Sequence, residues 1–313
     1  MPEFKPDFKS FSNLKDKVVV LTGGANGIGE KIVTSLYKIG AHVVFFDIEG
    51  PTCEAVVHRL KSEISSSGSL DYVVGDITKY NDVLALFQRA FEKHGQVDHA
   101  LCIAGITEAR DKNWFDEKLD LHGVTEAPST AIVDVNLTGT LYFTRIASVY
   151  LRQGNEDRTK DKSICLLGSV ASFKEQAGLF VYQPAKHGVL GLVRSTRKFF
   201  HHHHGIRINV VCPSMTNTRM ATPVMRLWEE YGVAGNEPQE IADYVLTLSG
   251  TRSSPYVGNI FGLCVFVEAG KGWEIEKDLD KCSAEWIGAE MAENALKIEA
   301  ALGNGSAWSN PQV

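Results

Sequence analysis

The sequence predicts an α/β fold, with one parallel sheet of seven strands covered by helices on both faces. Short apolar, β-branched runs alternate with longer segments in which apolar residues recur at helical spacing. The short runs are continuous rather than alternating with polar residues, which is typical of strands buried on both faces by crossover helices. The 313 residues are 44% hydrophobic and 22% charged, which is ordinary usage for a globular protein with a large core.

The first strand and helix show the pattern most clearly. Residues 18–21 are all apolar and mostly β-branched, which predicts a buried strand. Over 28–39, Ile32, Val33, Leu36 and Ile39 recur at helical spacing, and Gly40 follows as a C-terminal cap.

The same alternation continues along the chain. Apolar runs predict the other strands, and segments with helical periodicity between them predict the helices that connect parallel neighbours. The remaining strands are expected at 43–46, 72–74, 100–104, 163–167, 206–211 and 263–267, with helices at 52–65, 82–94, 131–151, 182–202 and 238–248.

Two stretches break the alternation, and they divide the chain into a core and extensions. The long acidic stretch 107–128 follows a strand and is expected at the rim of the sheet. The second break is the tail after residue 270, in which 283–302 is expected to be helical. We expect an N-terminal extension over 1–13, a single domain over 14–270 with a substrate loop near 213–235, and a partly helical extension over 271–313.

Composition excludes several classes of partner. The net charge of −6 argues against nucleic acid and anionic membranes, which need concentrated positive charge. No apolar run approaches the ~20 residues that a membrane helix needs, and 1–13 does not resemble a signal peptide. Six cysteines without a C-x-x-C pair indicate buried thiols in a reducing compartment, so we expect a cytoplasmic protein. The run 201–204 of four adjacent histidines is a poor joint metal site, and no metal is expected.

A glycine-rich segment follows the first predicted strand and opens the first helix. The residues expected to cradle a phosphate there are Gly23, Asn26, Gly27, Ile28 and Gly29. Glycines let backbone N–H groups approach a pyrophosphate, and the helix N-terminus adds its positive dipole. The spacing T-G-x-x-x-G-x-G in this context predicts a Rossmann-type, doubly wound dinucleotide fold.

Acidic residues after the second and third strands indicate which dinucleotide binds. Asp47 can accept hydrogen bonds from both ribose hydroxyls of an adenosine and would repel a 2′-phosphate, and the next residue, Ile48, is uncharged. The sequence therefore favours NAD over NADP. Asp76 could reach the adenine amino group while Ile77 packs on the ring, and this reading is favoured over the alternative that Asp76 caps the helix that follows Thr78.

Ser169, Tyr182 and Lys186 form a second set with chemical meaning. Tyr182 and Lys186 are four residues apart at the start of a predicted helix, so both project from one face. A neighbouring ammonium favours the phenolate, which can take a proton from an alcohol while hydride leaves for a nicotinamide. Ser169 lies just past the fifth strand, where its hydroxyl could hold the substrate oxygen.

Together these motifs resemble the short-chain dehydrogenase/reductase family over residues 14–270, and in particular its NAD-preferring branch that includes 15-hydroxyprostaglandin dehydrogenase. The resemblance implies that Tyr182 is the catalytic base, Lys186 its ribose-binding partner and Ser169 the substrate-positioning hydroxyl. It also implies a proton-relay role for Asn136, contacts of Pro213, Thr216 and Thr218 with the nicotinamide carboxamide, and dimers or tetramers formed through the helices at 131–151 and 182–202.

The sequence departs from the family pattern at two positions near this site. Ile103-Ala104-Gly105 stands where the family has Asn-Ala-Gly, which removes an asparagine that braces the sheet while Ala104 and Gly105 still line the cofactor. Ser214 follows Pro213 where the family has glycine, and Ser214 would be strained if that position required a positive φ.

The expected substrate walls are 106–114, 170–178 and 215–231, which are rich in aromatic, aliphatic and methionine side chains. They predict a bulky apolar secondary alcohol or its ketone, such as a terpenoid, a steroid-like compound or a polyketide of secondary metabolism. The nearby Arg219 is expected at the surface. Two alternatives remain for the same fold: a non-redox isomerase or cyclase, and a cofactor-sensing protein.

Overall fold

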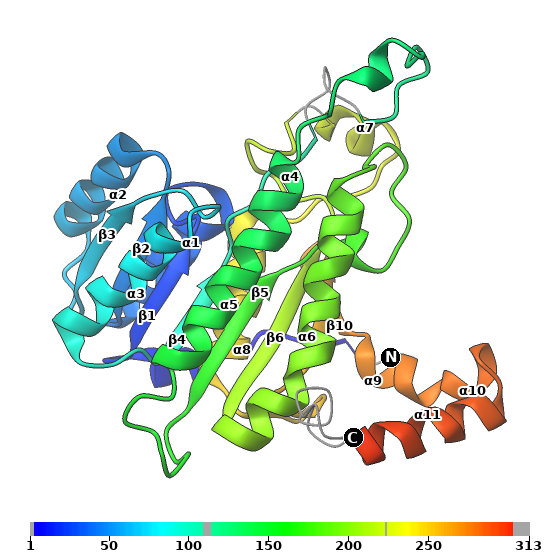
Figure 1. Cartoon of the computed structure of the whole chain (residues 1–313). Helices are drawn as coiled ribbons and strands as arrows, with labels where there is room; N and C mark the ends of the chain where they lie inside the picture. The colour runs from blue at the N-terminus through cyan, green and yellow to red at the C-terminus, as the bar shows by residue number, and fades with distance from the viewer. Residues whose placement is uncertain (1–2, 109–113, 223, 303–313) are drawn as a thin grey trace.

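The computed structural model describes residues 3–108, 114–222 and 224–302, and within them a sheet of eight strands forms the centre of the molecule (Figure 1). The strand order is β10-β9-β6-β5-β4-β1-β2-β3. The strands are β1 (Val18–Thr22), β2 (His42–Asp47), β3 (Leu70–Val74), β4 (His99–Cys102), β5 (Lys162–Leu167), β6 (Ile206–Pro213), β9 (Cys264–Glu268) and β10 (Lys271–Glu274). All neighbours are parallel except β9 and β10.

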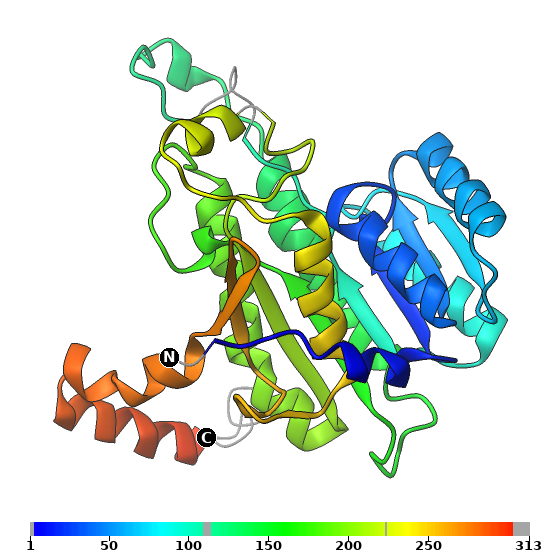
Figure 2. The same ribbon diagram turned by 180° about the vertical axis from the view of Figure 1, so that it is seen from behind.

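Helices cover both faces of the sheet, which confirms the doubly wound architecture. On one face α1 (Gly27–Ile39), α2 (Gly50–Glu63) and α8 (Pro238–Gly250) bury their apolar sides against the strands. Figure 2 shows α1 and α8 in front of the sheet. The other face is covered by α3 (Tyr80–His94), α5 (Gly139–Tyr150) and α6 (Tyr182–His204). Strands buried on both faces need no polar alternation, which explains their continuous apolar sequences.

The expected number of seven strands was one too few, because β10 adds an antiparallel edge. The chain reverses at Ala269 and Gly270, both of which have positive φ angles, and Lys271 pairs with Glu268. The four residues of β10 contain no apolar run, so periodicity could not reveal the strand. The N-terminal segment joins the same edge: the Phe4 N–H donates to the Gly272 carbonyl, and the Phe4 side chain is fully buried. A separate two-stranded hairpin consists of β7 (Ser253–Ser254) and β8 (Gly258–Asn259).

The helix expected over 131–151 is interrupted. It consists of α4 (Ala131–Val133), a π-helical turn over Asp134–Thr138, and α5. A π turn widens the helix locally and is frequent at functional sites. Here it places Asn136 in the interior with 1% of its surface exposed.

The tail is also divided more finely than the single helix expected over 283–302. It contains α9 (Glu276–Lys281), α10 (Ser283–Trp286) and α11 (Ala289–Leu302), with Gly288 in a left-handed conformation before α11. Figures 1 and 2 show α10 and α11 projecting away from the sheet.

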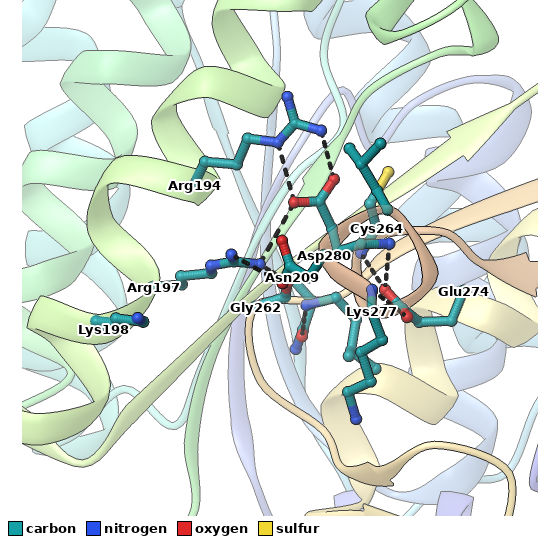
Figure 3. Close-up of polar contacts among 12 residues, drawn as sticks. Arg194, Arg197, Lys198, Asn209, Gly262, Cys264, Glu274, Lys277 and Asp280 are labelled. Atoms are coloured by element: carbon teal, nitrogen blue, oxygen red, sulfur yellow. Dashed lines mark hydrogen bonds and ion pairs between the residues drawn. The ribbon is translucent and has the colours of Figure 1, made fainter. Parts of the chain in front are cut away.

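The tail is attached to the body through α9. The Arg194 guanidinium makes a bidentate ion pair with the buried Glu276 carboxylate at 2.9 and 2.6 Å, and Arg197 adds a contact at 3.4 Å. Figure 3 shows Arg194 and Arg197 extending from α6 toward this region, with Lys277 and Asp280 nearby. Bidentate arginine–carboxylate pairs with a buried partner hold elements in a defined orientation, so α9 is fixed to α6.

A cavity of about 1000 Å³ separates α6 from the outer tail helices, and its lining includes Leu263, Ile287 and Leu296. It lies beside the start of β9 rather than at the carboxyl ends of the strands. Within the described part of the chain, no helix combines the length and the apolar character that crossing a membrane requires.

Candidate active site

The carboxyl ends of the parallel strands bring the expected site residues to one edge of the sheet. Thr22 ends β1, Asp47 ends β2, Leu167 ends β5 and Pro213 ends β6. In open sheets of this topology a ligand lies beyond these ends, where the strand order reverses. In this chain the reversal falls between β4 and β1.

The glycine loop leaves no room for a side chain at Gly23 or Gly29. A Cβ at Gly29 would lie 1.8 Å from the Gly23 carbonyl oxygen, and one at Gly23, whose φ is +72°, would lie 2.8 Å from the Ala104 backbone. Helix α1 starts at Gly27, and its N-cap residue Asn26 makes no side-chain capping bond. The N-terminal amide groups of α1 therefore retain the capacity to bind an anion, and the compact turn fits a dinucleotide pyrophosphate. The neighbouring Ile28 packs partly against the core.

Asp47 braces this loop. Its carboxylate accepts hydrogen bonds from the N–H of Ala25 at 3.0 Å and of Glu49 at 3.3 Å, while the adjacent Ile48 is 67% exposed. In the folded chain a basic residue also lies near Asp47. Arg219, on the loop after β6, is 3.8 Å from the Glu49 carboxylate. The Arg219 side chain is 85% exposed, as expected of a surface residue.

Asp76 and Ile77 follow β3. The Asp76 carboxylate accepts a hydrogen bond from the Thr78 N–H at 2.9 Å, which closes a turn ahead of α3, whose N-cap residue is Lys79. Ile77 is 5% exposed, and its side chain lies against the position where a Cβ on Gly139 would stand. This packing directs the Ile77 side chain into the core.

Lys186 and Tyr182 come together at the start of α6. The Lys186 ammonium donates to the Leu167 carbonyl at 2.8 Å and lies 5.5 Å from the centre of the Tyr182 ring. Lys186 is only 3% exposed, whereas Tyr182 is partly exposed. Ser169 lies just beyond β5, and its Oγ accepts a hydrogen bond from the Ala171 N–H at 3.2 Å.

Asn136 connects the π-helical turn to the loop after β4. Its Nδ2 donates to the Ile106 carbonyl at 2.8 Å, and its Oδ1 accepts from the Ile106 N–H at 2.9 Å. A Cβ placed on Gly105 would lie 3.0 Å from the Asn136 Oδ1 and 3.6 Å from the Lys186 ammonium. Asn136 and Lys186 therefore converge on Gly105, where any side chain would crowd them.

The backbone is hydrogen-bonded at both positions that depart from the family pattern. The Thr22 hydroxyl oxygen accepts hydrogen bonds from the N–H groups of Ile103 and Ala104 at 3.2 and 3.3 Å, which ties β1 to the end of β4. The Ile103 side chain packs in the core. Ser214 is not among the described residues with positive φ, and its N–H donates to the Val267 carbonyl at 2.8 Å.

The loop after β6 approaches the glycine loop. Thr216 is buried and forms a β-bridge with Asn236. The methyl group of Thr218 lies 3.3 Å from the position of a Cβ on Gly27. Residues 216–218 therefore close over one side of the dinucleotide cradle.

Apolar side chains remain exposed around the opening of the site. Phe115 and Phe180 form an edge-to-face pair with ring centres 5.5 Å apart, although they are 62% and 41% exposed. Exposed apolar residues also include Ile106, Met220 and Leu227. Phe173, by contrast, packs on Phe266 at the core. Within the expected walls, 109–113 and 223 fall outside the described residues.

Sequence reasoning missed one residue at this site. The Glu108 carboxylate accepts hydrogen bonds from the N–H groups of Val181 and Tyr182, at the start of α6. The sequence contains only a weak sign of this contact. Val181 has no side chain that can cap the helix, so a hydrogen-bond acceptor from another segment was needed. No cluster of three potential metal ligands occurs among the residues that the structure describes.

Comparison with known proteins agrees with this geometry. A family model of short chain dehydrogenases matches residues 17–227. The short-chain dehydrogenase/reductase ascJ of Acremonium egyptiacum is 32% identical over 277 residues, which cover 88% of this chain and 86% of that protein. The 5′-hydroxyaverantin dehydrogenase of Dothistroma septosporum is 29% identical over 231 residues. The aligned region covers 71% of this chain and 74% of that protein.

Solved structures show the same fold. The 3-ketoacyl-(acyl-carrier-protein) reductase of Brucella melitensis, solved with NADH, superimposes with a TM-score of 0.67 at 24% identity, covering 82% of this chain and 98% of that one. A dinucleotide cradle, a buried lysine against a tyrosine and a matching family model together identify this chain as a member of the short-chain dehydrogenase/reductase family, whose oxidoreductases use a nicotinamide cofactor.

Proposed function

We propose that this protein transfers hydride between NAD and a bulky, apolar secondary alcohol or its ketone, with Tyr182 as general base and acid. The observation that carries the proposal is the placement of Lys186. Its buried ammonium is held by the Leu167 carbonyl beside the Tyr182 ring, so a positive charge is available where a phenolate would form. Preorganised charge of this kind stabilises a proton-transfer transition state.

A bound nicotinamide would supply the hydride acceptor for oxidation and the donor for reduction. The chain holds and deprotonates the alcohol. Ser169 and Tyr182 hydrogen-bond the alcohol oxygen, and the Tyr182 phenolate takes the hydroxyl proton as the carbonyl forms. Lys186 stabilises the phenolate, and Asn136 holds the Ile106 backbone in the loop that starts at Gly105, beside Lys186. For ketone reduction the same proton returns from Tyr182 to the oxygen.

The preference for NAD rests on charge. Asp47 presents a carboxylate at the end of β2, where it would hydrogen-bond ribose hydroxyls and repel a 2′-phosphate. The exposed Arg219 guanidinium lies 3.8 Å from the Glu49 carboxylate, which partly offsets its charge. We therefore place Arg219 outside phosphate recognition.

The substrate class rests on the exposed apolar rim. Phe115, Phe180 and Leu227 leave apolar surface in solvent that a bulky ligand would cover. A relative named as a dehydrogenase of 5′-hydroxyaverantin supports a secondary-metabolite substrate.

We also propose a homodimer or homotetramer formed through α5 and α6. Leu141, Val149 and Phe199 expose apolar surface on these helices. A cytoplasmic location agrees with six cysteines that are all free thiols.

The cofactor is tested first, by fluorescence titration of the purified protein with NADH and with NADPH. We expect NADH to bind at least tenfold more tightly; tighter NADPH binding would refute the Asp47 argument. Apolar secondary alcohols are then screened with NAD.

The catalytic assignment is tested with Tyr182→Phe, for which we expect a loss of kcat of about 10²–10⁴-fold with unchanged NADH binding. Tyr256→Phe, at a half-exposed tyrosine on the β7–β8 hairpin, is the control and should behave as wild type. Product that forms without any net change in NADH would favour the non-redox alternative, and full activity of Tyr182→Phe would exclude the proposed role of the tyrosine.

A further inference from the structure

The first turn of α6 carries Tyr182, yet it has no capping side chain of its own. Val181 occupies the N-cap position, and an apolar side chain cannot accept a hydrogen bond from the free N–H groups of a first turn. Such groups need partners when they are removed from water, and Val181 is 6% exposed.

The partners of these N–H groups can all be identified. The Gln183 N–H donates to the Leu179 carbonyl, and Pro184 has no N–H to satisfy. The N–H groups of Val181 and Tyr182 remain, and both donate to one carboxylate oxygen of Glu108, the latter at 3.0 Å. A single side chain from a distant loop thus completes the cap, and its negative charge stands at the positive end of a 23-residue helix.

Glu108 is itself held in place by the site. It lies two residues after Ile106, whose N–H and carbonyl are both bonded to the Asn136 side chain. Gly105, just before Ile106, lies next to the Asn136 side chain and the Lys186 ammonium. Residues 105–108 therefore form a strap that joins the π-helical turn to the backbone of Tyr182.

We propose that Glu108 is a positioning residue for Tyr182. The inference rests on the proposed dehydrogenase function. Two charge-assisted hydrogen bonds fix the backbone of Val181 and Tyr182 at the start of α6, and through it the distance between the Tyr182 hydroxyl and the substrate oxygen. Misplacement of a catalytic group by about 1 Å can cost about 100-fold in rate. Glu108 belongs to the acidic stretch 107–128, so the cap also ties the first residues of that stretch to the catalytic helix.

The test compares Glu108→Ala, Glu108→Gln and the control Glu117→Ala. Glu117 is an exposed carboxylate in the same segment. We expect Glu108→Ala to lower kcat about 10- to 100-fold while the NADH dissociation constant and the melting temperature stay within about twofold and a few degrees of wild type. Glu108→Gln keeps an acceptor oxygen and should retain kcat within about threefold of wild type. Glu117→Ala should match wild type.

Hydrogen exchange gives a readout that needs no turnover. The Val181 and Tyr182 amides should exchange at least tenfold faster in Glu108→Ala than in wild type or Glu108→Gln. Wild-type kcat and unchanged exchange in Glu108→Ala would overturn the inference, as would a Gln variant as impaired as the Ala variant. A wild-type protein that binds NADH but oxidises no alcohol and reduces no ketone would instead refute the proposed function, and the exchange rates would then decide whether Glu108 positions Tyr182.

Discussion

Acid should weaken this fold through one buried histidine, His99, at the start of β4. His99 is 1% exposed, and its Nδ1 lies 2.8 Å from the Ser163 hydroxyl on β5. Burial lowers the pKa of His99 from 6.5 to about 4, and Asp161 and Asp98 only partly oppose this effect. The folded protein therefore holds the imidazole neutral in a pH range where the unfolded chain would protonate it.

The sign and size follow from linkage. Above pH 6.5 neither state binds this proton, so the stabilisation is fully present; it is lost as the pH falls from 6.5 toward 4. Between pH 7 and pH 5 a shift of this size removes about 2 kcal/mol from the free energy of unfolding. That is a large part of the about 5–15 kcal/mol that typically stabilises a domain.

The assay is urea unfolding of wild type and His99→Gln at pH 7, 6 and 5. Glutamine does not titrate and can still hydrogen-bond Ser163. We expect the variant to lose about 2 kcal/mol less than wild type between pH 7 and pH 5. His58→Gln, at an exposed histidine on α2, should keep the wild-type pH dependence. Equal losses in wild type and His99→Gln would refute the reasoning.

Three further changes test the cradle and the core. Gly29→Ala places a Cβ 1.8 Å from the Gly23 carbonyl oxygen, so NADH titration should show affinity at least tenfold weaker in a folded protein; wild-type affinity would contradict the packing. Asp47→Ala removes a carboxylate acceptor and should weaken NADH binding about 10- to 100-fold with little change for NADPH, which titration with both cofactors checks; an equal loss for both would argue against discrimination at this carboxylate. Lys162→Met strands the buried Asp98 carboxylate 2.8 Å away and should cost about 3–5 kcal/mol in urea unfolding, with part of the loss recovered by adding Asp98→Asn; no recovery would argue against the pairing.

Much of the fold could be predicted because most strands and helices produce a periodic pattern of apolar residues within their own segment. The central parallel strands have apolar sequences because both faces are buried, and the helices between them show apolar residues at helical spacing. β10 was not predicted, because it is an edge strand of only four residues without an apolar run. Its outer side pairs with the segment at Phe4. The break before α11 depends on the backbone conformation of Gly288, which a helical pattern does not reveal.

Site residues that are close in sequence could be predicted from their spacing alone. The glycine positions are set by a single turn, and the four-residue separation of Tyr182 and Lys186 places them on one helix face, where the structure shows the ammonium 5.5 Å from the ring centre. Tertiary structure alone brought Glu108 to the start of α6 and Asn136 to Ile106 through a π turn. These contacts join segments separated by 30 or more residues, so they depend on how the strands are ordered in the sheet, and no periodicity within either segment encodes that order.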